Sequence, residues 1–169
     1  MRLRLAVIVL AGAAVVVPAA GAKLTPAEQT WVSPLLKIWN TQYAAGGLVS
    51  KQASAKGSLV AGTKANETLL NTLAALVDCK EPHDRIKAAG NPPSPRLDTF
   101  QTELNTACED DLQGANLVAK SINAVRDGKT SLATSRLRAG ISALYKGRLQ
   151  LVKAYEVITK AGKGSGLTA

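Results

Sequence analysis

Two residues of opposite charge occupy positions where the apolar pattern of the chain predicts hydrophobic side chains. The heptad pattern places Asp111 on the apolar face of one predicted helix and Arg148 on that of the next. A turn at 128–129 would bring these positions to nearly the same level of two neighbouring helices. Because a buried charge is costly unless it is paired, we expect Arg148 to form a buried ion pair with Asp111, or with Glu109 or Asp110. The alternative is that these charges line a pocket for a polar ligand.

Cys79 and Cys108 are the two cysteines of the chain. In an exported protein the oxidising compartment favours a disulfide between them. Closing the loop between them would stabilise the fold by roughly 3 to 4 kcal/mol. A redox-active pair would be expected as C-x-x-C, so we predict a structural disulfide.

A second group of polar side chains lies near the middle of the chain, where Asp78, Glu81, His83 and Asp84 supply four possible metal donors. Their spacing matches no defined metal signature, so we expect no metal. Haem is not expected either, because His83 is the only histidine, Met1 is the only methionine and C-x-x-C-H is absent. We therefore expect no cofactor.

Catalysis is not supported by the polar residues. A hydrolytic nucleophile would need His83 as its base, and no G-x-S-x-G sequence is present. Glu109, Asp110 and Asp111 are adjacent, so on a helix they point in different directions and do not face one substrate together. We assign no catalytic residue and expect a protein that is not an enzyme.

The elements that position these residues are expected to be helices, because helical signals recur and alternating strand patterns do not. Thr25-Pro26-Ala27-Glu28 has the form of a capping box with proline in the first turn. We predict an all-α, antiparallel, up-down-up-down four-helix bundle. Its helices are expected from Thr25 to Gly46-Gly47, from Leu48 to Asp78, from Ser94-Pro95 to Arg126, and from Thr130 to Ala161.

The second predicted helix is poor in large side chains between residues 50 and 63. If the chain turns at Gly46-Gly47, Gly62 lies across from Trp31 and Ser54 from Trp39, so that small residues make room for large ones. A long, Pro-rich connection over 80–94 then follows, in which 82–89 could form a short helix. It exceeds the usual length of a connection between bundle helices.

The N-terminal residues have the form of a secretory signal peptide. Arg2 and Arg4 precede an apolar run over 5–17, and Ala20-Gly21-Ala22 is a small-x-small cleavage site. The run is shorter than the roughly 20 residues that span a bilayer, so we expect no transmembrane segment in the mature chain. We predict a signal peptide over 1–22, a helical domain over 23–162, a disordered tail over 163–169, and a secreted or periplasmic protein.

Positive charge is concentrated at the C-terminal end. Residues 112–169 carry ten Lys and Arg against Asp127 and Glu156. Tyr145 and Tyr155 are the aromatic residues there and both are expected on the apolar stripe, so nucleic-acid binding is disfavoured. We predict instead a surface for an acidic envelope polymer or protein. Its residues would be Arg126, Lys129, Arg136, Arg138, Lys146, Lys153 and Lys160.

The function predicted from these patterns is that of an exported, non-catalytic binding or interaction module at or near the cell envelope, contacting its partner through a basic C-terminal helix. A second hypothesis is a carrier that holds a small hydrophobic ligand in the bundle interior. The patterns do not predict an oligomeric state.

Overall fold

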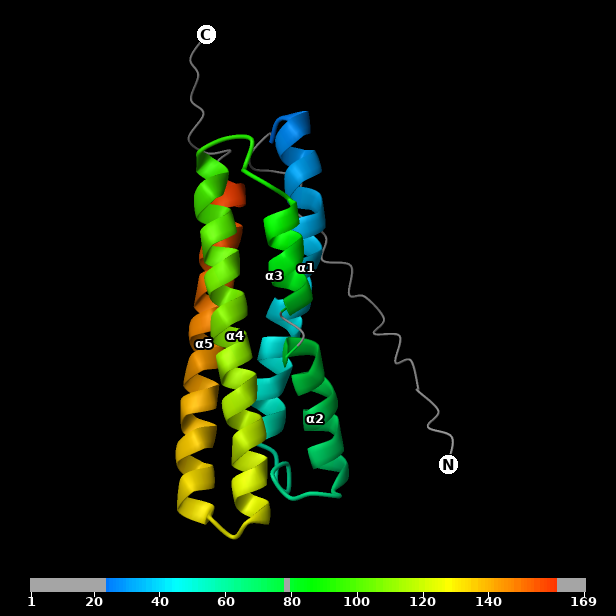
Figure 1. The fold of residues 1–169 in the computed structure, drawn as a ribbon, viewed down its shortest axis with the longest axis vertical. Coiled ribbons are helices and arrows are strands. Elements are labelled where there is room, and N and C mark those ends of the chain that lie inside the picture. Colours follow the sequence, from blue (N-terminus) through cyan, green and yellow to red (C-terminus); the bar gives the residue numbers. More distant parts are fainter. Residues whose placement is uncertain (1–23, 78–79, 161–169) are drawn as a thin grey trace, which may run out of the picture.

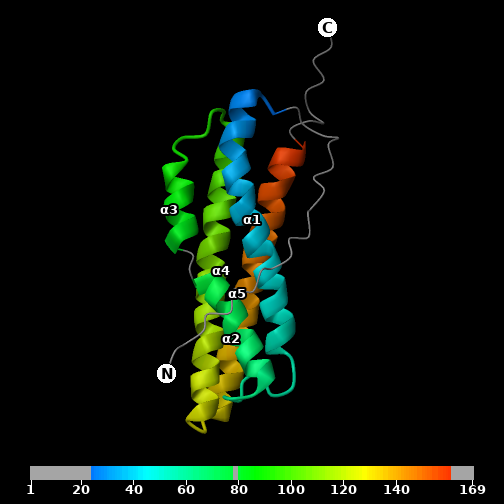
Figure 2. The same cartoon turned by 90° about the vertical axis from the view of Figure 1, so that its right-hand side faces the viewer.

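A computed structural model of the chain describes residues 24–77 and 80–160, and no strand occurs among them. The described residues form five helices and the segments that join them, and Figures 1 and 2 show the helices running along one long axis. They are α1 (Pro26–Ala53), α2 (Lys64–Val77), α3 (Lys80–Ala88), α4 (Arg96–Arg126) and α5 (Thr130–Lys160). The all-helical class predicted from the sequence is confirmed.

Some predicted features fall where the structure gives no description. The predicted signal peptide over 1–22 and the predicted tail over 163–169 lie outside the described residues. None of the described helices combines the length and the apolar character that crossing a membrane requires.

The first helix is longer than predicted, because α1 continues through Gly46-Gly47 to Ala53. Gly46 is buried in that helix, and the chain reverses only over 54–63. Gly57 and Gly62 make this turn, with φ of +83° and +79°, a conformation that side-chain-bearing residues rarely adopt. The prediction of a turn at Gly46-Gly47 was wrong. Glycines are frequent in turns, and the sequence has them both at 46–47 and at 57 and 62, so only the packing of the helices decides where the chain reverses.

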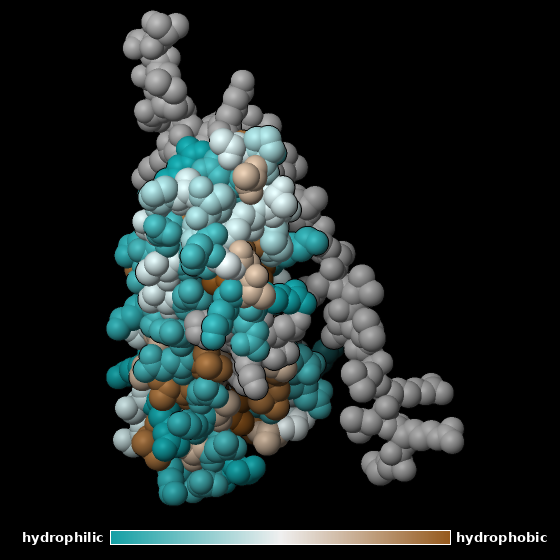
Figure 3. All heavy atoms as spheres, turned by 45° about the horizontal axis from the view of Figure 1, so that its top comes forward, coloured by the Kyte–Doolittle hydropathy of each residue, from teal (hydrophilic) through white to brown (hydrophobic). Residues whose placement is uncertain are grey.

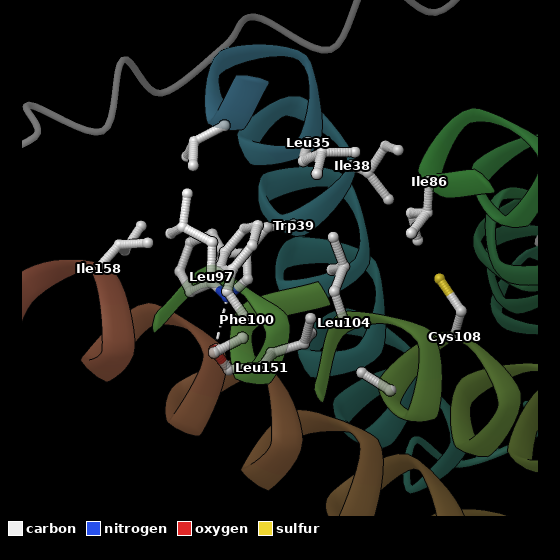
Figure 4. Packing of buried hydrophobic residues seen from close by; sticks show 13 residues of the cluster. Leu35, Ile38, Trp39, Ile86, Leu97, Phe100, Leu104, Cys108, Leu151 and Ile158 are labelled. Carbon is white, nitrogen blue, oxygen red and sulfur yellow. Dashed lines mark hydrogen bonds between the residues drawn. The ribbon is translucent and has the colours of Figure 1, made fainter. Parts of the chain in front are cut away.

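With the turn displaced, the tryptophans of α1 do not pack on small residues of the next helix. Trp39 instead stacks on Tyr43 and Tyr155, with ring centroids 4.9 and 5.0 Å away, and its indole N–H donates to the Leu151 carbonyl at 2.6 Å. Figure 4 shows this bond within the core cluster that α1, α3, α4 and α5 share. The predicted proximity of Trp39 to Ser54 was therefore wrong, and Trp39 ties α1 to α5.

Trp31 fastens the same helix to the segment after α3. Its indole N–H donates to the Ala89 carbonyl at 2.9 Å, and its ring meets Phe100 of α4 edge-on at 6.3 Å. The position predicted for it opposite Gly62 was also wrong. The predicted connection is mostly helical, since α3 occupies its first half and buries Ile86 completely (Figure 4).

The N-termini of α1 and α4 are joined through Glu28, which is 3% exposed. Thr25 and Glu28 form the predicted capping box. The Glu28 carboxylate also accepts hydrogen bonds from Ser94 Oγ at 2.5 Å and Arg96 Nε at 2.7 Å and forms an ion pair with the Arg96 guanidinium. These donors, Arg96 first, hold the pKa of Glu28 well below its usual range despite burial.

Helices α4 and α5 are joined by a short turn at Gly128 and approach each other through small residues. A Cβ on Gly140 would lie 2.9 Å from the Gly114 carbonyl oxygen, and one on Gly147 would lie 3.1 Å from that of Ala107. The small residues recur every seventh position, which keeps them on one side of each helix. All are buried, as Ala107, Gly114 and Ser121 on α4 and as Ala133, Gly140, Gly147 and Ala154 on α5.

Replacing Gly140 with alanine should destabilise the protein by about 2 kcal/mol, because the new Cβ meets backbone atoms that cannot move aside. The matched control is Gly46→Ala, whose Cβ would find Asp111 Oδ1 at 3.6 Å, an ordinary contact. That control should be neutral or stabilising by up to about 1 kcal/mol, because alanine favours a helix. Urea unfolding of both variants measures the difference, and equal stability would show that α4 and α5 are not in close contact.

Replacing Glu28 with glutamine should destabilise the protein by about 2 kcal/mol near neutral pH, because charge-assisted hydrogen bonds are lost. The folded-state pKa of Glu28 is depressed, so the carboxylate stabilises the fold above its unfolded-state pKa of about 4.3 and loses this effect as the pH falls below it. The gap between wild type and variant should therefore narrow in acid. Urea unfolding at neutral and at acidic pH measures the difference in stability between wild type and variant. The exposed Glu67→Gln is the control. A difference that does not change with pH would contradict the prediction.

Candidate functional site

The solvent side of α5 carries an apolar stripe that packing inside the molecule does not use. Tyr145 is 62% exposed, Leu149 is 44% exposed and Val152 is 39% exposed. Their spacing of four and three residues places them on one side of the helix. Tyr145 was expected on the core stripe, and that prediction was wrong, since the neighbouring Leu144 takes the buried position.

Exposed cations flank this stripe, and the exposed Glu156 follows Val152 at its C-terminal end. Arg138 lies on the line of the stripe two turns before Tyr145, Lys146 and Lys153 lie along one side, and Arg148 lies along the other. Glu156 is the one acidic residue of α5. We call the three apolar residues and these four cations the outer face of α5.

Of the seven predicted polyanion contacts, Arg138, Lys146 and Lys153 lie on the outer face. Lys160 is in the last turn of α5, and its side chain is outside the description. The other three cations lie elsewhere: Arg126 and Lys129 lie near Asp127 at 4.0 and 3.9 Å, and Arg136 donates to the Lys120 carbonyl at 3.2 Å.

Asp111 lies at the opposite extreme of exposure. Its side chain is 1% exposed, and neither carboxyl oxygen has a hydrogen-bond partner. Its Oδ1 lies 3.6 Å from where a Cβ of Gly46 would be and 2.5 Å from where one of Gly147 would be. Burial, and secondly the charge of Asp110, raise the pKa of Asp111 from 3.8 to about 8. The carboxyl is therefore neutral at neutral pH.

Arg148 does not form the predicted ion pair with Asp111. Its Nη2 donates to the Tyr43 hydroxyl at 2.9 Å, and its guanidinium carbon lies 4.5 Å from the centroid of the Tyr43 ring. Its Nη1 lies 3.0 Å from where a Cβ of Gly47 would be. The physical reason is the continuation of α1: Asp111 contacts Gly46, while Arg148 contacts the next residue of α1 and stays exposed.

The alternative partners of Arg148 are not engaged with it either. Glu109 is exposed. Asp110 is half-buried, and its pKa is raised, mainly by burial, while the charge of Lys146 acts in the opposite direction. The three acidic residues thus have three different environments, and they do not converge on one point.

The structure does not support the predicted disulfide. Cys108 of α4 is 2% exposed in the core cluster that α1, α3, α4 and α5 share, and Cys79 lies outside the described residues. Among the residues that are described, no group of three or more His, Cys, Asp or Glu could hold a metal ion. Asp84 is exposed, Asp78 is outside the description, and the side chains of Glu81 and His83 are not described.

An open depression lies at the turn between α4 and α5, lined by the five residues 128–132 and by Ser135. It is on the surface, so it differs from the interior cavity that a carrier would need. No protein-family model, curated protein or solved structure matches the chain.

Replacing Asp111 with asparagine should remove a pH dependence of stability. The unfolded chain releases this proton near pH 4 and the folded chain keeps it to about pH 8, so the contribution of Asp111 to wild-type stability is greatest below this window. It should fall by about 1.4 kcal/mol for each pH unit within the window and level off above it. Asp111→Asn should lack this slope in urea titrations, whereas the exposed Asp98→Asn should keep it. A wild-type curve without the slope would show that Asp111 is charged and paired in solution.

Proposed function

We propose that the protein is an exported, non-catalytic helical module that binds an acidic component of the cell envelope through the outer face of α5. Export is argued from residues 1–22, which have the form of a signal peptide. Binding is argued from the gathering of exposed positive charge on one helix with a single acidic residue. Such a surface attracts anionic partners.

The observation that carries the proposal is that Arg138, Lys146, Arg148 and Lys153 are all exposed and lie around a common stripe. A lone surface cation contributes little to binding, but several at helical spacing act on the same partner. Arg148 is held in place by Tyr43. Part of the face is therefore ordered before a partner arrives, which lowers the entropy cost of binding.

The proposal includes a topology for the helices. We infer that α2 and α3 run in the same direction as one interrupted helix, so that the molecule is an antiparallel up-down-up-down four-helix bundle. A disulfide between Cys79 and Cys108 remains part of the proposal, because an oxidising compartment favours it. It would join the segment between α2 and α3 to α4.

A hydrophobic-ligand carrier is not the function we propose. The small residues between 50 and 63, which could have lined a cavity, form the end of α1 and the following turn. Trp39 is packed against Tyr43, Tyr155 and the backbone of Leu151.

Reversing three charges of the outer face tests the proposal. The variant Arg138→Glu/Lys146→Glu/Lys153→Glu should bind the envelope fraction of the producing cell at least tenfold more weakly than wild type, because each cation contributes up to about 1 kcal/mol near an anionic surface. The matched control is Lys37→Glu/Lys51→Glu/Lys64→Glu, which makes the same change of net charge at exposed positions of α1 and α2.

Pull-down assays at low and high salt measure both variants. Wild-type binding should weaken as salt is added, because ions screen exposed charges. If the two triple variants bind alike, or if salt leaves the affinity unchanged, the outer face of α5 is not the binding surface.

A further inference from the structure

The outer face of α5 has an apolar centre as well as a cationic border, and this combination restricts the chemistry of its partner. Seven large hydrophobic side chains are exposed in the described chain, and Tyr145, Leu149 and Val152 lie within two turns of α5. The other four lie on four different segments: Leu48 on α1, Val60 in the turn over 54–63, Leu70 on α2 and Leu132 in the first turn of α5. Hydrophobic side chains also gather elsewhere, in the lower half of the side that Figure 3 presents, on which α4 lies in front of α5.

We propose that the acidic component bound by α5 is the surface of an anionic lipid bilayer. The helix would lie flat, with the three apolar side chains entering the headgroup region and the four cations contacting lipid phosphates. This inference rests on the proposed function and names its partner. A soluble polyanion would be held by the cations alone and would leave Tyr145, Leu149 and Val152 without a role.

The chemistry of the side chains fits an interface between water and lipid. Tyrosine combines an apolar ring with a polar hydroxyl and is enriched at that depth of membranes. Lysine and arginine can extend their charged ends toward phosphates while their stems cover apolar surface. A helix with leucine and aromatic residues on one side and Lys and Arg beside them binds anionic membranes in the interface plane.

The fold presents this face as a rigid surface. The opposite side of α5 packs against α4 and α1, and Gly140, Gly147, Leu151 and Ala154 are all buried there. The outer face therefore need not be released from the core before it meets a membrane. Docking of the intact protein in one orientation is expected, with α4 lying away from the lipid.

Vesicle binding tests the proposal. Wild-type protein should co-sediment with vesicles containing phosphatidylglycerol and phosphatidylcholine, and at least tenfold less with vesicles of phosphatidylcholine alone. The variant Tyr145→Ser/Leu149→Ser/Val152→Ser should lose roughly tenfold or more of the binding to anionic vesicles. Its retention by immobilised heparin, a soluble polyanion, should be unchanged, because all four cations remain.

The matched control is Leu48→Ser/Val60→Ser/Leu70→Ser, which removes three comparably exposed apolar side chains from other segments. It should bind anionic vesicles as wild type does. All proteins are made in the same form, so any contribution of the N-terminal residues is common to them. Thermal unfolding followed by circular dichroism confirms that each variant is folded.

The outcomes separate this inference from the proposed function. If heparin retains the wild type but anionic vesicles do not, or if the apolar variant binds vesicles as tightly as wild type, the lipid proposal is overturned and a polymer or protein partner remains. If neither heparin nor anionic vesicles bind the wild type, both proposals fail.

Discussion

The close approach of α4 and α5 is the constraint on which the remaining structure depends. Ordinary helix pairs are held 8–10 Å apart, depending on the side chains at the contact, and small residues permit the closest approach. At Gly114 and Gly140 a Cβ would lie within 3 Å of the facing backbone. The two helices therefore form one unit, joined by a short turn at Gly128, and α1, α2 and α3 pack on it.

This pairing also explains why a carboxylic acid can occupy the interior. Asp111 is one turn beyond Ala107 on α4, where Gly147 leaves room for its side chain. Helix α1 closes the site at Gly46, and water and counter-charges are kept away. The favourable state there is the neutral acid, since ionisation would leave an unpaired charge in an apolar site. Because Arg148 does not enter this site, its guanidinium stays on the Tyr43 ring at the surface. It therefore adds a positive charge to the outer face of α5.

Local patterns predicted the features that are decided within a few residues. The capping box at Thr25, the limits of α4, the start of α5 and the short helix before Gly90 follow from such patterns, and the structure contains all of them. The end of α1 could not be predicted, because Gly46-Gly47 and Gly57 offer the same backbone freedom. The choice between them depends on the contacts of Gly46 and Gly47 with α4 and α5, which are distant in sequence.

The candidate site was also predictable only where local patterns decide it. Charge counts alone placed the basic surface on the last helix, but they could not separate Arg138 from Arg136, which differ by two residues and point to different sides. The heptad pattern put Asp111 and Arg148 on facing helices and could not show that a third helix lies against both. A clearer signal was available in the sequence: the seven-residue recurrence of Ala133, Gly140, Gly147 and Ala154 marks the side of α5 that faces α4.

That recurrence also determines which part of α5 is available for function. The side with the small residues is needed for packing, so a larger side chain there has a direct cost in stability. The opposite side makes no packing demand, and scattered exposed apolar residues there would need no explanation. Tyr145, Leu149 and Val152 are not scattered, because they form one stripe with cations along both sides. Since neither stability nor solubility accounts for such a stripe, contact with an apolar and anionic partner is the requirement that explains it best.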